Sequence, residues 1–385
     1  MTRMSAKALN WSLRLLVAVM MLIVLDIHHS AFANAKTRAD IDSAAACQTG
    51  RDSLARLDAA TRTNVLSPPK RDGHAVNVDI GLYVERLDSI SEVDHSFQVE
   101  AFLELIWCDP RLAYQGEPNA PDRIIYLEDR AHEEHGRIWG PDIIFVNTAG
   151  PPDVQQEELI IFPDGTVIYE ERVAVSLRAR YDFTKFPFDS QRLAIEIESF
   201  SWPSSDLVLH RDEAKIGFSE GFNIPSWDLT GFTSEIRNVR EIRDRDTFSE
   251  LLFVIHAERV PEPFVYRLIL PLLLIVMISW SVFWLRTSDT GRFGVTFTTI
   301  LTVVAFNFVV TDKLPNVPEV TYMETLFGFA FLFLLLVVIQ NTVADRLTAF
   351  GRDAQSERFD ALARVAFPVV FFAGVTAVTY AFGIL

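Results

Sequence analysis

One uncharged stretch in the C-terminal half constrains this chain more than any other feature. Between Arg292 and Asp312 lie 19 residues without a charged side chain, and an α-helix of that length extends for about 28 Å, close to the hydrocarbon thickness of a bilayer. One face of this helix is small and hydroxylated at its start, apolar in its middle and acidic at its end. Such a face indicates several helices packed around a water-filled axis. Its residues are Gly294, Thr298, Leu301, Ala305, Phe308 and Asp312.

Three further apolar stretches predict a membrane domain over residues 261–385. Acidic residues concentrate before residue 264, and the formal net charge of the whole chain is −16. The chain therefore combines an acidic soluble part with a membrane part. No basic stripe is present to neutralise phosphates, which argues against nucleic acid as a partner. The four expected helices occupy about 264–285, 293–311, 322–343 and 365–385.

Residues 1–33 have the pattern of a secretory signal peptide. Basic residues precede the apolar run Leu15–Leu25, and the small residues Ala31 and Ala33 provide a cleavage site before Asn34. An uncleaved N-terminal anchor is the alternative. In the favoured interpretation the soluble part is exported.

The next segment, residues 34–75, is polar and rich in alanine, and we expect a short N-terminal arm without chemistry of its own. The chain has two cysteines, Cys47 and Cys108. Nothing in their spacing requires a bond between them, and we expect them to be unpaired.

Residues 76–260 consist of short alternating or aromatic-rich segments separated by turn sequences. One of these turns contains Asp164-Gly165, the dipeptide of a tight hairpin. Many short strands without a long helix predict an antiparallel β-sandwich.

The charges of the three linkers between the expected helices predict their orientation. The first linker carries Arg286 and Arg292, the third carries four arginines, and the middle one has only Lys313 as a basic residue. Because basic residues favour the cytoplasmic side, the first and third linkers are expected there. The sandwich and the C-terminus then both lie outside, as the signal peptide also requires.

Several motifs follow one another along the chain: Trp107-Cys108-Asp109-Pro110-Arg111-Leu112, Trp139-Gly140-Pro141-Asp142 followed by Asn147, Phe186-Pro187-Phe188-Asp189-Ser190-Gln191, Arg259 twelve residues before Pro271, Leu314-Pro315, and Ala366-Phe367-Pro368. In this order they resemble the pentameric ligand-gated ion channels, the Cys-loop receptor superfamily, and most of all its bacterial branch. The resemblance extends from about Val76 to Leu385. Ala179 and Leu193 stand where animal members have two cysteines, and only a short basic linker, Leu347–Arg364, precedes the last helix.

The resemblance implies a homopentamer in a bacterial inner membrane, with the second helix lining an ion pore. Thr298 would then form a ring of hydroxyls, and Leu301, Ala305 and Phe308 an apolar constriction that blocks ions by dewetting. The alternative is that this face packs against neighbouring helices. Partners of such a channel are a small-molecule agonist or protons, membrane lipid and the permeating ions, and no cofactor is expected.

Ion selectivity depends on charges at the two pore mouths. The resemblance places Asp289 and Arg292 at the inner mouth, where the neighbouring Thr290 and Gly291 are similar to anion-conducting animal members. Asp312 at the outer mouth and the acidic exterior favour cations instead. We expect cation selectivity.

A further set of residues is implied to transmit motion from the sandwich to the pore. Arg259 matches a basic residue of the family, and Asp189 and Glu92 match its acidic partners. The alternative is a salt bridge that only stabilises the fold. The complete set, including the linker after the pore helix, is Glu92, Asp189, Arg259, Leu314, Pro315 and Pro318.

Family members bind agonists between subunits in a box of aromatic residues. The matching positions here are Phe102, Phe200 and Phe248, which could hold an organic cation. Val146 replaces a common tyrosine, and the capping loop with Arg243 and Arg245 would suit a zwitterion or an anion. Each phenylalanine has the alternative of belonging to the sandwich core.

Proton gating is a second mode, acting through groups such as Glu92, His95 or Asp189. The segment His132-Glu133-Glu134-His135 is expected to be a solvated loop rather than a metal site, because it lacks HExxH spacing.

Two other classes of protein fit this sequence less well. A membrane-anchored binding module without conductance would not need four spans and a semi-polar helix. An enzyme is disfavoured because the sequence has no Gly-rich phosphate loop, nucleophile elbow or zinc motif.

Overall fold

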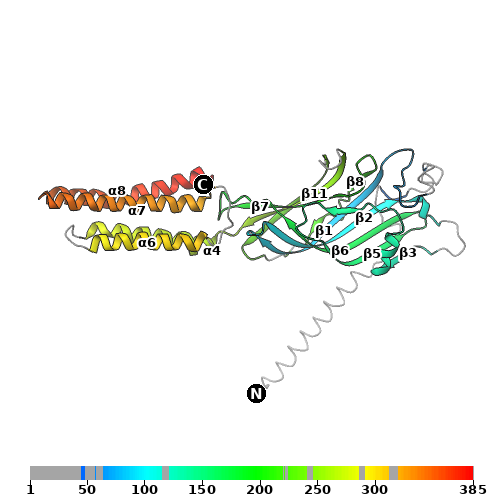
Figure 1. Cartoon of the computed structure of the whole chain (residues 1–385), viewed down its shortest axis with the longest axis horizontal. Helices are drawn as coiled ribbons and strands as arrows, with labels where there is room; N and C mark the ends of the chain where they lie inside the picture. Colours follow the sequence, from blue (N-terminus) through cyan, green and yellow to red (C-terminus); the bar gives the residue numbers. More distant parts are fainter. Residues whose placement is uncertain are drawn as a thin grey trace, which may run out of the picture.

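The computed structural model describes residues 45–47, 57, 64–114, 121–219, 221, 224–240, 246–285, 291–311 and 320–384. It places a β-sandwich at one end of an elongated molecule and a bundle of helices at the other (Figure 1). The predicted signal peptide and most of the predicted N-terminal arm lie outside the described residues. The expected fold class, a β-sandwich followed by four candidate transmembrane helices, is confirmed.

Two sheets form the sandwich. The first has the order β3-β5-β6-β2-β1-β8, with β9 also paired to β1, and the second has the order β10-β11-β7-β4. Strands β8 and β9 run parallel to β1, whereas the other pairs of named strands are antiparallel. The strands are β1 (Val76–Ser91), β2 (Ser96–Cys108), β3 (Ile124–Leu127), β4 (Ile143–Phe145), β5 (Asp153–Ile161), β6 (Thr166–Arg178), β7 (Ser190–Ser199), β8 (Leu207–Arg211), β9 (Gly217–Phe218), β10 (Trp227–Arg240) and β11 (Thr247–Arg259).

Alternating side chains build the core between the sheets. In β7, Leu193, Ile195 and Ile197 are fully buried, and the residues between them point outward. The predicted hairpin joins β5 to β6 at Gly165, whose φ is +89°. A Cβ there would lie 2.5 Å from the carbonyl oxygen of Asp109, so this close approach requires glycine.

Cys47 and Cys108 form a disulfide, and the expectation that they are unpaired is wrong. The bond joins the arm to the end of β2, and the Cys47 N–H donates to Thr166 Oγ1 at 2.9 Å. Their separation of 61 residues carries no signal of pairing. Only the folded sheet brings the arm against the end of β2.

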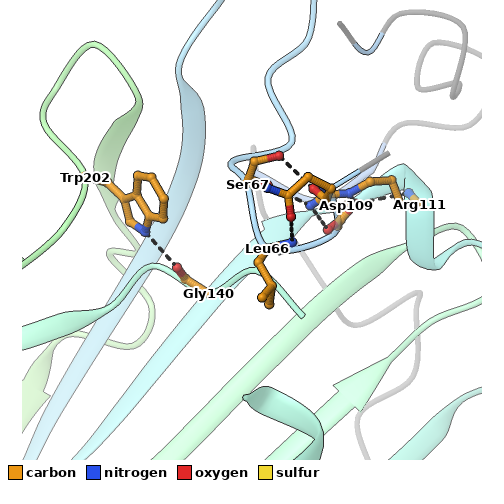
Figure 2. Close-up of polar contacts among 7 residues, drawn as sticks. Leu66, Ser67, Asp109, Arg111, Gly140 and Trp202 are labelled. Atoms are coloured by element: carbon orange, nitrogen blue, oxygen red, sulfur yellow. Dashed lines mark hydrogen bonds and ion pairs between the residues drawn. The ribbon is translucent and has the colours of Figure 1, made fainter. Parts of the chain in front are cut away.

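A buried ion pair reinforces the same corner. Arg111 donates to both carboxylate oxygens of Asp109, at 2.8 and 2.7 Å, and to the Ser67 carbonyl at 3.0 Å. Figure 2 shows this group beside the hydrogen bond from Trp202 to the Gly140 carbonyl. The Trp-Cys-Asp-Pro-Arg and Trp-Gly-Pro-Asp motifs therefore hold loops at the ends of the strands.

The membrane part has four helices long and apolar enough to cross a bilayer. In the first span, Pro271 cannot donate a backbone hydrogen bond, and a π-helical turn lies just before it. A capping box between Thr321 and Glu324 starts the third span. The helices are α4 (Glu262–Phe264), the π-turn η4 (Val265–Ile269), α5 (Leu270–Trp280), the 3₁₀ turn η5 (Ser281–Trp284), α6 (Gly291–Thr311), α7 (Tyr322–Ala349) and α8 (Asp353–Ala381).

Two expected helix boundaries differ from the structure. Helix α7 ends at Ala349 rather than near 343, and α8 begins at Asp353 rather than near 365. The expected linker Leu347–Arg364 is therefore helical except for a turn at Gly351, whose φ is +71°. An apolar stretch marks only the part of a helix in the hydrocarbon, and charged residues continue the helix beyond it.

A short helix, α3 (Asp129–His135), replaces the loop expected around His132. It packs on β5 and β3, and its His135 ring stacks on Tyr169 of β6 with centroids 4.2 Å apart.

Candidate pore, coupling and ligand sites

The predicted pore residues of α6 share one exposed face. Leu301 is 68% exposed and Phe308 is 69% exposed, and Gly294, Thr298 and Ala305 are exposed as well. Spacings of four and three residues place all five on one side of the helix. The opposite side is buried against the other helices through Arg292, Thr296, Thr299 and Val303.

The hydroxyl groups of α6 divide between these two faces. Thr296 donates to the Arg292 carbonyl at 2.9 Å, and Thr299 donates to the Thr296 carbonyl at 2.8 Å. Among the described residues, the Thr298 hydroxyl has no hydrogen-bond partner. The hydroxyl predicted to contact ions is therefore available on the exposed face.

Arg292, which the resemblance implied at the inner pore mouth, has its side chain buried among the helices of the single chain. Its side chain is 2% exposed and donates to both carboxylate oxygens of Asp360 on α8, at 3.1 and 2.9 Å. Gln340 on α7 also donates to Asp360, at 2.6 Å. The reason is that burial of an arginine among helices requires a carboxylate partner, and α8 supplies one.

The predicted coupling residues Glu92, Asp189 and Arg259 meet at the membrane end of the sandwich. The Arg259 Nε and Nη2 atoms donate to the two carboxylate oxygens of Asp189, at 2.7 and 3.1 Å. Its Nη1 donates to Glu92 at 2.6 Å. The guanidinium also lies over the rings of Trp227 and Phe186, at 4.3 and 4.9 Å from their centroids.

This arrangement keeps the Arg259 side chain charged although it is 1% exposed. Burial by itself lowers the pKa of the guanidinium, but the hydrogen bond and charge of Asp189, followed by those of Glu92, raise it overall. Asp189 is equally buried and accepts a further hydrogen bond from Gln191 at 2.6 Å. Every partner in this cluster therefore depends on the others.

The loop that carries Asp189 contacts three of the four spans. The Thr184 carbonyl accepts from the Tyr322 N–H at 2.8 Å at the start of α7, and Lys185 donates to the Gly383 carbonyl at 3.1 Å, just beyond α8. The Phe186 ring packs against Phe264 with centroids 5.1 Å apart. The C-terminus consequently lies at the junction with the sandwich (Figure 1).

The predicted ligand residues lie on different sheets. Phe102 on β2 is half-buried under the guanidinium of Arg172, 5.7 Å from the ring centroid, in a concavity of about 280 Å³. Val146 and Phe200 flank the other sheet and are 38% and 51% exposed. One chain therefore carries two separate parts of the predicted box.

Phe248 on β11 is 2% exposed, enclosed by the chain's own residues. It offers no face to a ligand, in contrast to the expected role, because its strand lies in the middle of the sheet with both faces largely covered. The remaining predicted site residues lie outside the described residues: Arg243, Arg245, Asp289, Asp312, Leu314, Pro315 and Pro318.

A titratable cluster beside α3 was not predicted from the sequence. Glu157 on β5 lies opposite Glu171 on β6, and Tyr169 donates to Glu171 at 3.1 Å. Burial raises the pKa of Glu171 to about 7 and lowers that of His135 to about 4. The pairing of Glu157 with Glu171 would have indicated this cluster, but it follows from the register of β5 against β6, which the sequence does not specify.

Comparisons with known proteins cover both parts of the chain. The family described as neurotransmitter-gated ion-channel ligand binding domain matches residues 57–261, and the family described as neurotransmitter-gated ion-channel transmembrane region matches residues 268–349.

Individual relatives come from a bacterium and from animals. A proton-gated ion channel of Gloeobacter violaceus is 31% identical over 307 residues, which cover 80% of this chain and 83% of the relative. The gamma-aminobutyric acid receptor subunit rho-2 of Bos taurus is 29% identical over 73% of this chain, and subunit theta of Mus musculus is 30% identical over 71%. The matches cover 60% and 43% of these two animal subunits, less than two thirds of their length.

Proposed function

Because this chain belongs to the pentameric ligand-gated ion channels, we propose that five copies enclose a pore lined by α6. Members of this family form pentamers and conduct ions when a ligand binds, and the chain is a ligand-gated ion channel rather than an enzyme. The number of copies, the pore-lining residues and the gating stimulus are part of the proposal.

The single observation that carries the pore is the exposed face of α6. Gly294, Thr298, Leu301, Ala305 and Phe308 are uncovered in one chain, while the opposite face is already packed. In a ring of five copies this free face turns toward the axis. Leu301 and Phe308 then form the narrowest apolar rings, which exclude ions by dewetting.

Cysteine accessibility tests this assignment. Cysteines at Thr298 and Leu301 should react with a water-soluble thiol reagent while the channel is active, and the reaction should block the current. Cysteines at the buried positions Thr299 and Val303 serve as matched controls and should stay unmodified. Equal reactivity on both faces, or none at Thr298 and Leu301, would reject α6 as the pore lining.

We place the channel in a bacterial inner membrane with the sandwich and the C-terminus outside. The arginine-rich linkers support this orientation. The Cys47–Cys108 disulfide supports it independently, because structural disulfides persist in oxidising compartments. A protease added to intact spheroplasts should cleave the sandwich and leave the turn at Gly351 uncut.

The proposed selectivity is for cations. The positive charge of Arg292 is neutralised by Asp360 inside the bundle, so it does not oppose cations at the inner end of α6. The acidic exterior concentrates cations near the outer mouth. A reversal potential that follows the sodium gradient is expected, and one that follows chloride would contradict this selectivity.

Protons are a second candidate stimulus, because the raised pKa of Glu171 lies in the physiological range and a similar protein is described as a proton-gated ion channel. Current recorded from reconstituted protein between pH 4 and pH 8, without other ligands, tests it. A current that is independent of pH would leave a small-molecule agonist as the stimulus.

A further inference from the structure

A wide groove on the outer face of the β4-β7-β10-β11 sheet collects basic side chains. Its volume is about 1090 Å³. On β7 it uses the outward-pointing positions of a strand whose alternate residues fill the core. Its charged lining consists of Arg178, Arg180, Arg192, Arg237 and His95, with only Asp94 and Glu196 as acidic residues.

Three of these arginines have no anionic partner in the part of the chain that the structure describes. Among the described residues, the side chains of Arg178, Arg180 and Arg192 form neither a hydrogen bond nor an ion pair, whereas Arg237 pairs with Glu250 at 2.6 Å. The whole chain has a net charge of −16, so acidic partners are abundant elsewhere. Guanidinium groups without a carboxylate partner give this groove a positive charge, which favours an anion.

The floor of the groove is apolar. Ala194, Leu252 and Val254 line it, and the last two are 9% and 2% exposed. A cationic rim above a hydrocarbon floor suits a small organic anion better than a bare inorganic ion. Carboxylates in particular match the forked geometry of guanidinium groups.

One wall of the groove is held rigidly. The Asn147 side chain donates to the Arg178 carbonyl at 2.9 Å and to the Ala194 carbonyl at 2.8 Å. Asn147 therefore ties the end of β6 to β7 at the groove, and a ligand would meet a preformed surface.

The position of the arginines relates the groove to the coupling loop. Arg180 precedes the loop that carries Asp189, and Arg192 follows it on β7. An anion bound by both guanidinium groups would join the two ends of that loop. The same loop contacts α7, α8 and the start of the first span through Thr184, Lys185 and Phe186.

We propose that this groove binds a small organic dianion with two carboxylates, held between Arg180 and Arg192. Binding needs only the sandwich, whereas its effect on the current rests on the proposed channel function. The groove is separate from the concavity at Phe102, which lies on the other sheet, and Val146, one of the predicted ligand residues, is part of its lining.

Succinate is the probe, with its neutral dimethyl ester and sulfate as comparison compounds. Purified full-length protein in nanodiscs is unfolded thermally across a succinate titration. Succinate should raise Tm saturably, and the diester should not. The Arg180→Gln and Arg192→Gln variants should each weaken apparent affinity at least tenfold. Arg130→Gln, a matched change at an exposed arginine of α3 outside the groove, should bind as the unmodified protein does.

Four results would overturn the proposal. They are no shift in the unmodified protein, equal shifts in all variants, a shift that sulfate reproduces in full, and dissociation of the assembly in Arg192→Gln. The last result would assign the groove to contact between subunits. Currents recorded from the same preparations distinguish failure of the anion site from failure of the channel function. Succinate binding without any conductance would reject the channel function and still support the anion site.

Discussion

Arg259 shows at the scale of one residue how a buried charge can serve two domains. Two carboxylates and three aromatic rings surround its guanidinium, and the carboxylates come from different loops of the sandwich. The first span begins at Glu262, three residues after Arg259. A displacement of Asp189 would therefore move Arg259 and the start of this span. The cost of leaving the arginine unpaired is about 3–5 kcal/mol.

Asp189→Asn should therefore impair gating more than Glu92→Gln, since Asp189 is 1% exposed and makes two bonds to Arg259, whereas Glu92 is 21% exposed and makes one. We expect assembled protein at the membrane with a loss of current, measured by surface labelling and recording on the same cells. If Asp189→Asn abolishes assembly while Glu92→Gln conducts normally, the pair is a stabilising salt bridge only.

Glu171 predicts a dependence of stability on pH. Burial raises its folded pKa from 4.5 to about 7, so between these values the folded state binds a proton that the unfolded state has lost. The free energy of unfolding contributed by this group therefore falls as pH rises from 4.5 to 7, by on the order of 3 kcal/mol.

Thermal unfolding at several pH values measures this effect. Glu171→Gln should flatten the fall in Tm across that range, and Glu133→Gln, an exposed carboxylate on α3, should not. The groups that face Glu171 are Glu157, directly across the strand pair, and the Tyr169 hydroxyl. An unchanged slope in Glu171→Gln would assign the pH dependence to other groups.

At the scale of elements, α6 is held on one side and free on the other. Its start is fixed to α8 by the Arg292–Asp360 pair and to α7 by the hydrogen bond from Asn341 to Thr296, at 3.0 Å. Within the described chain, Arg292 Nε, Gln340 Oε1 and Asn341 Oδ1 have no hydrogen-bond partner, so this polar cluster is incompletely satisfied. Its hydrogen bonds fix the orientation of the three helices, and the loss of one partner would leave other buried polar groups unpaired.

Asp360→Asn should destabilise the bundle by about 3–5 kcal/mol because it leaves Arg292 uncompensated inside the membrane part. The exchange Arg292→Asp with Asp360→Arg should recover part of that loss, since the charges remain paired. Detergent-resistant assembly as a function of temperature measures both. Equal stability of Asp360→Asn and the unmodified protein would show that the pair does not position α6.

The free face of α6 gives the next prediction. Phe308→Ala and Leu301→Ser widen or wet the proposed apolar rings, so both should produce current in the absence of a stimulus. Val303→Ala on the packed face is the control and should lower stability without such a leak. Unchanged resting conductance in both Phe308→Ala and Leu301→Ser would remove these residues from the gate.

At the scale of the whole molecule, specific contacts between described residues join the two parts. One loop of the sandwich touches the beginning of the first span, the beginning of α7 and the residue after Phe382 at the end of α8. The Phe188 and Phe382 rings also lie against Tyr322, at 5.9 and 5.7 Å. Motion of this loop can therefore reach several helices at once.

The disulfide acts at the opposite end of the sandwich and should leave gating unchanged. Its loop of 61 residues predicts a loss of about 4 kcal/mol when both cysteines become serine. The double variant should show a lower Tm of the sandwich with normal current per assembled channel. A normal Tm, or a gating defect at full stability, would contradict this role.

Much of the architecture was predictable because it depends on local pattern. Hydrophobic length marked the spans, alternation marked the sandwich, and helical spacing grouped Thr298, Leu301 and Phe308 on one face. The boundaries of α7 and α8 were less accurate, since charged residues extend a helix beyond the hydrocarbon without an apolar signal. The burial of Phe248 depends on which faces of its strand are covered.

By itself the sequence determined the class of protein, the membrane spans and the face of α6 available to a pore, because periodicity and motif order are properties of one chain read locally. Tertiary structure decided the pairing of Cys47 with Cys108, the inward turn of Arg292 toward Asp360, and the gathering of unpaired arginines in one groove. The two cysteines are 61 residues apart and Arg292 and Asp360 are 68 residues apart, so the contact energies of these pairs exist only once the sheets and helices have packed.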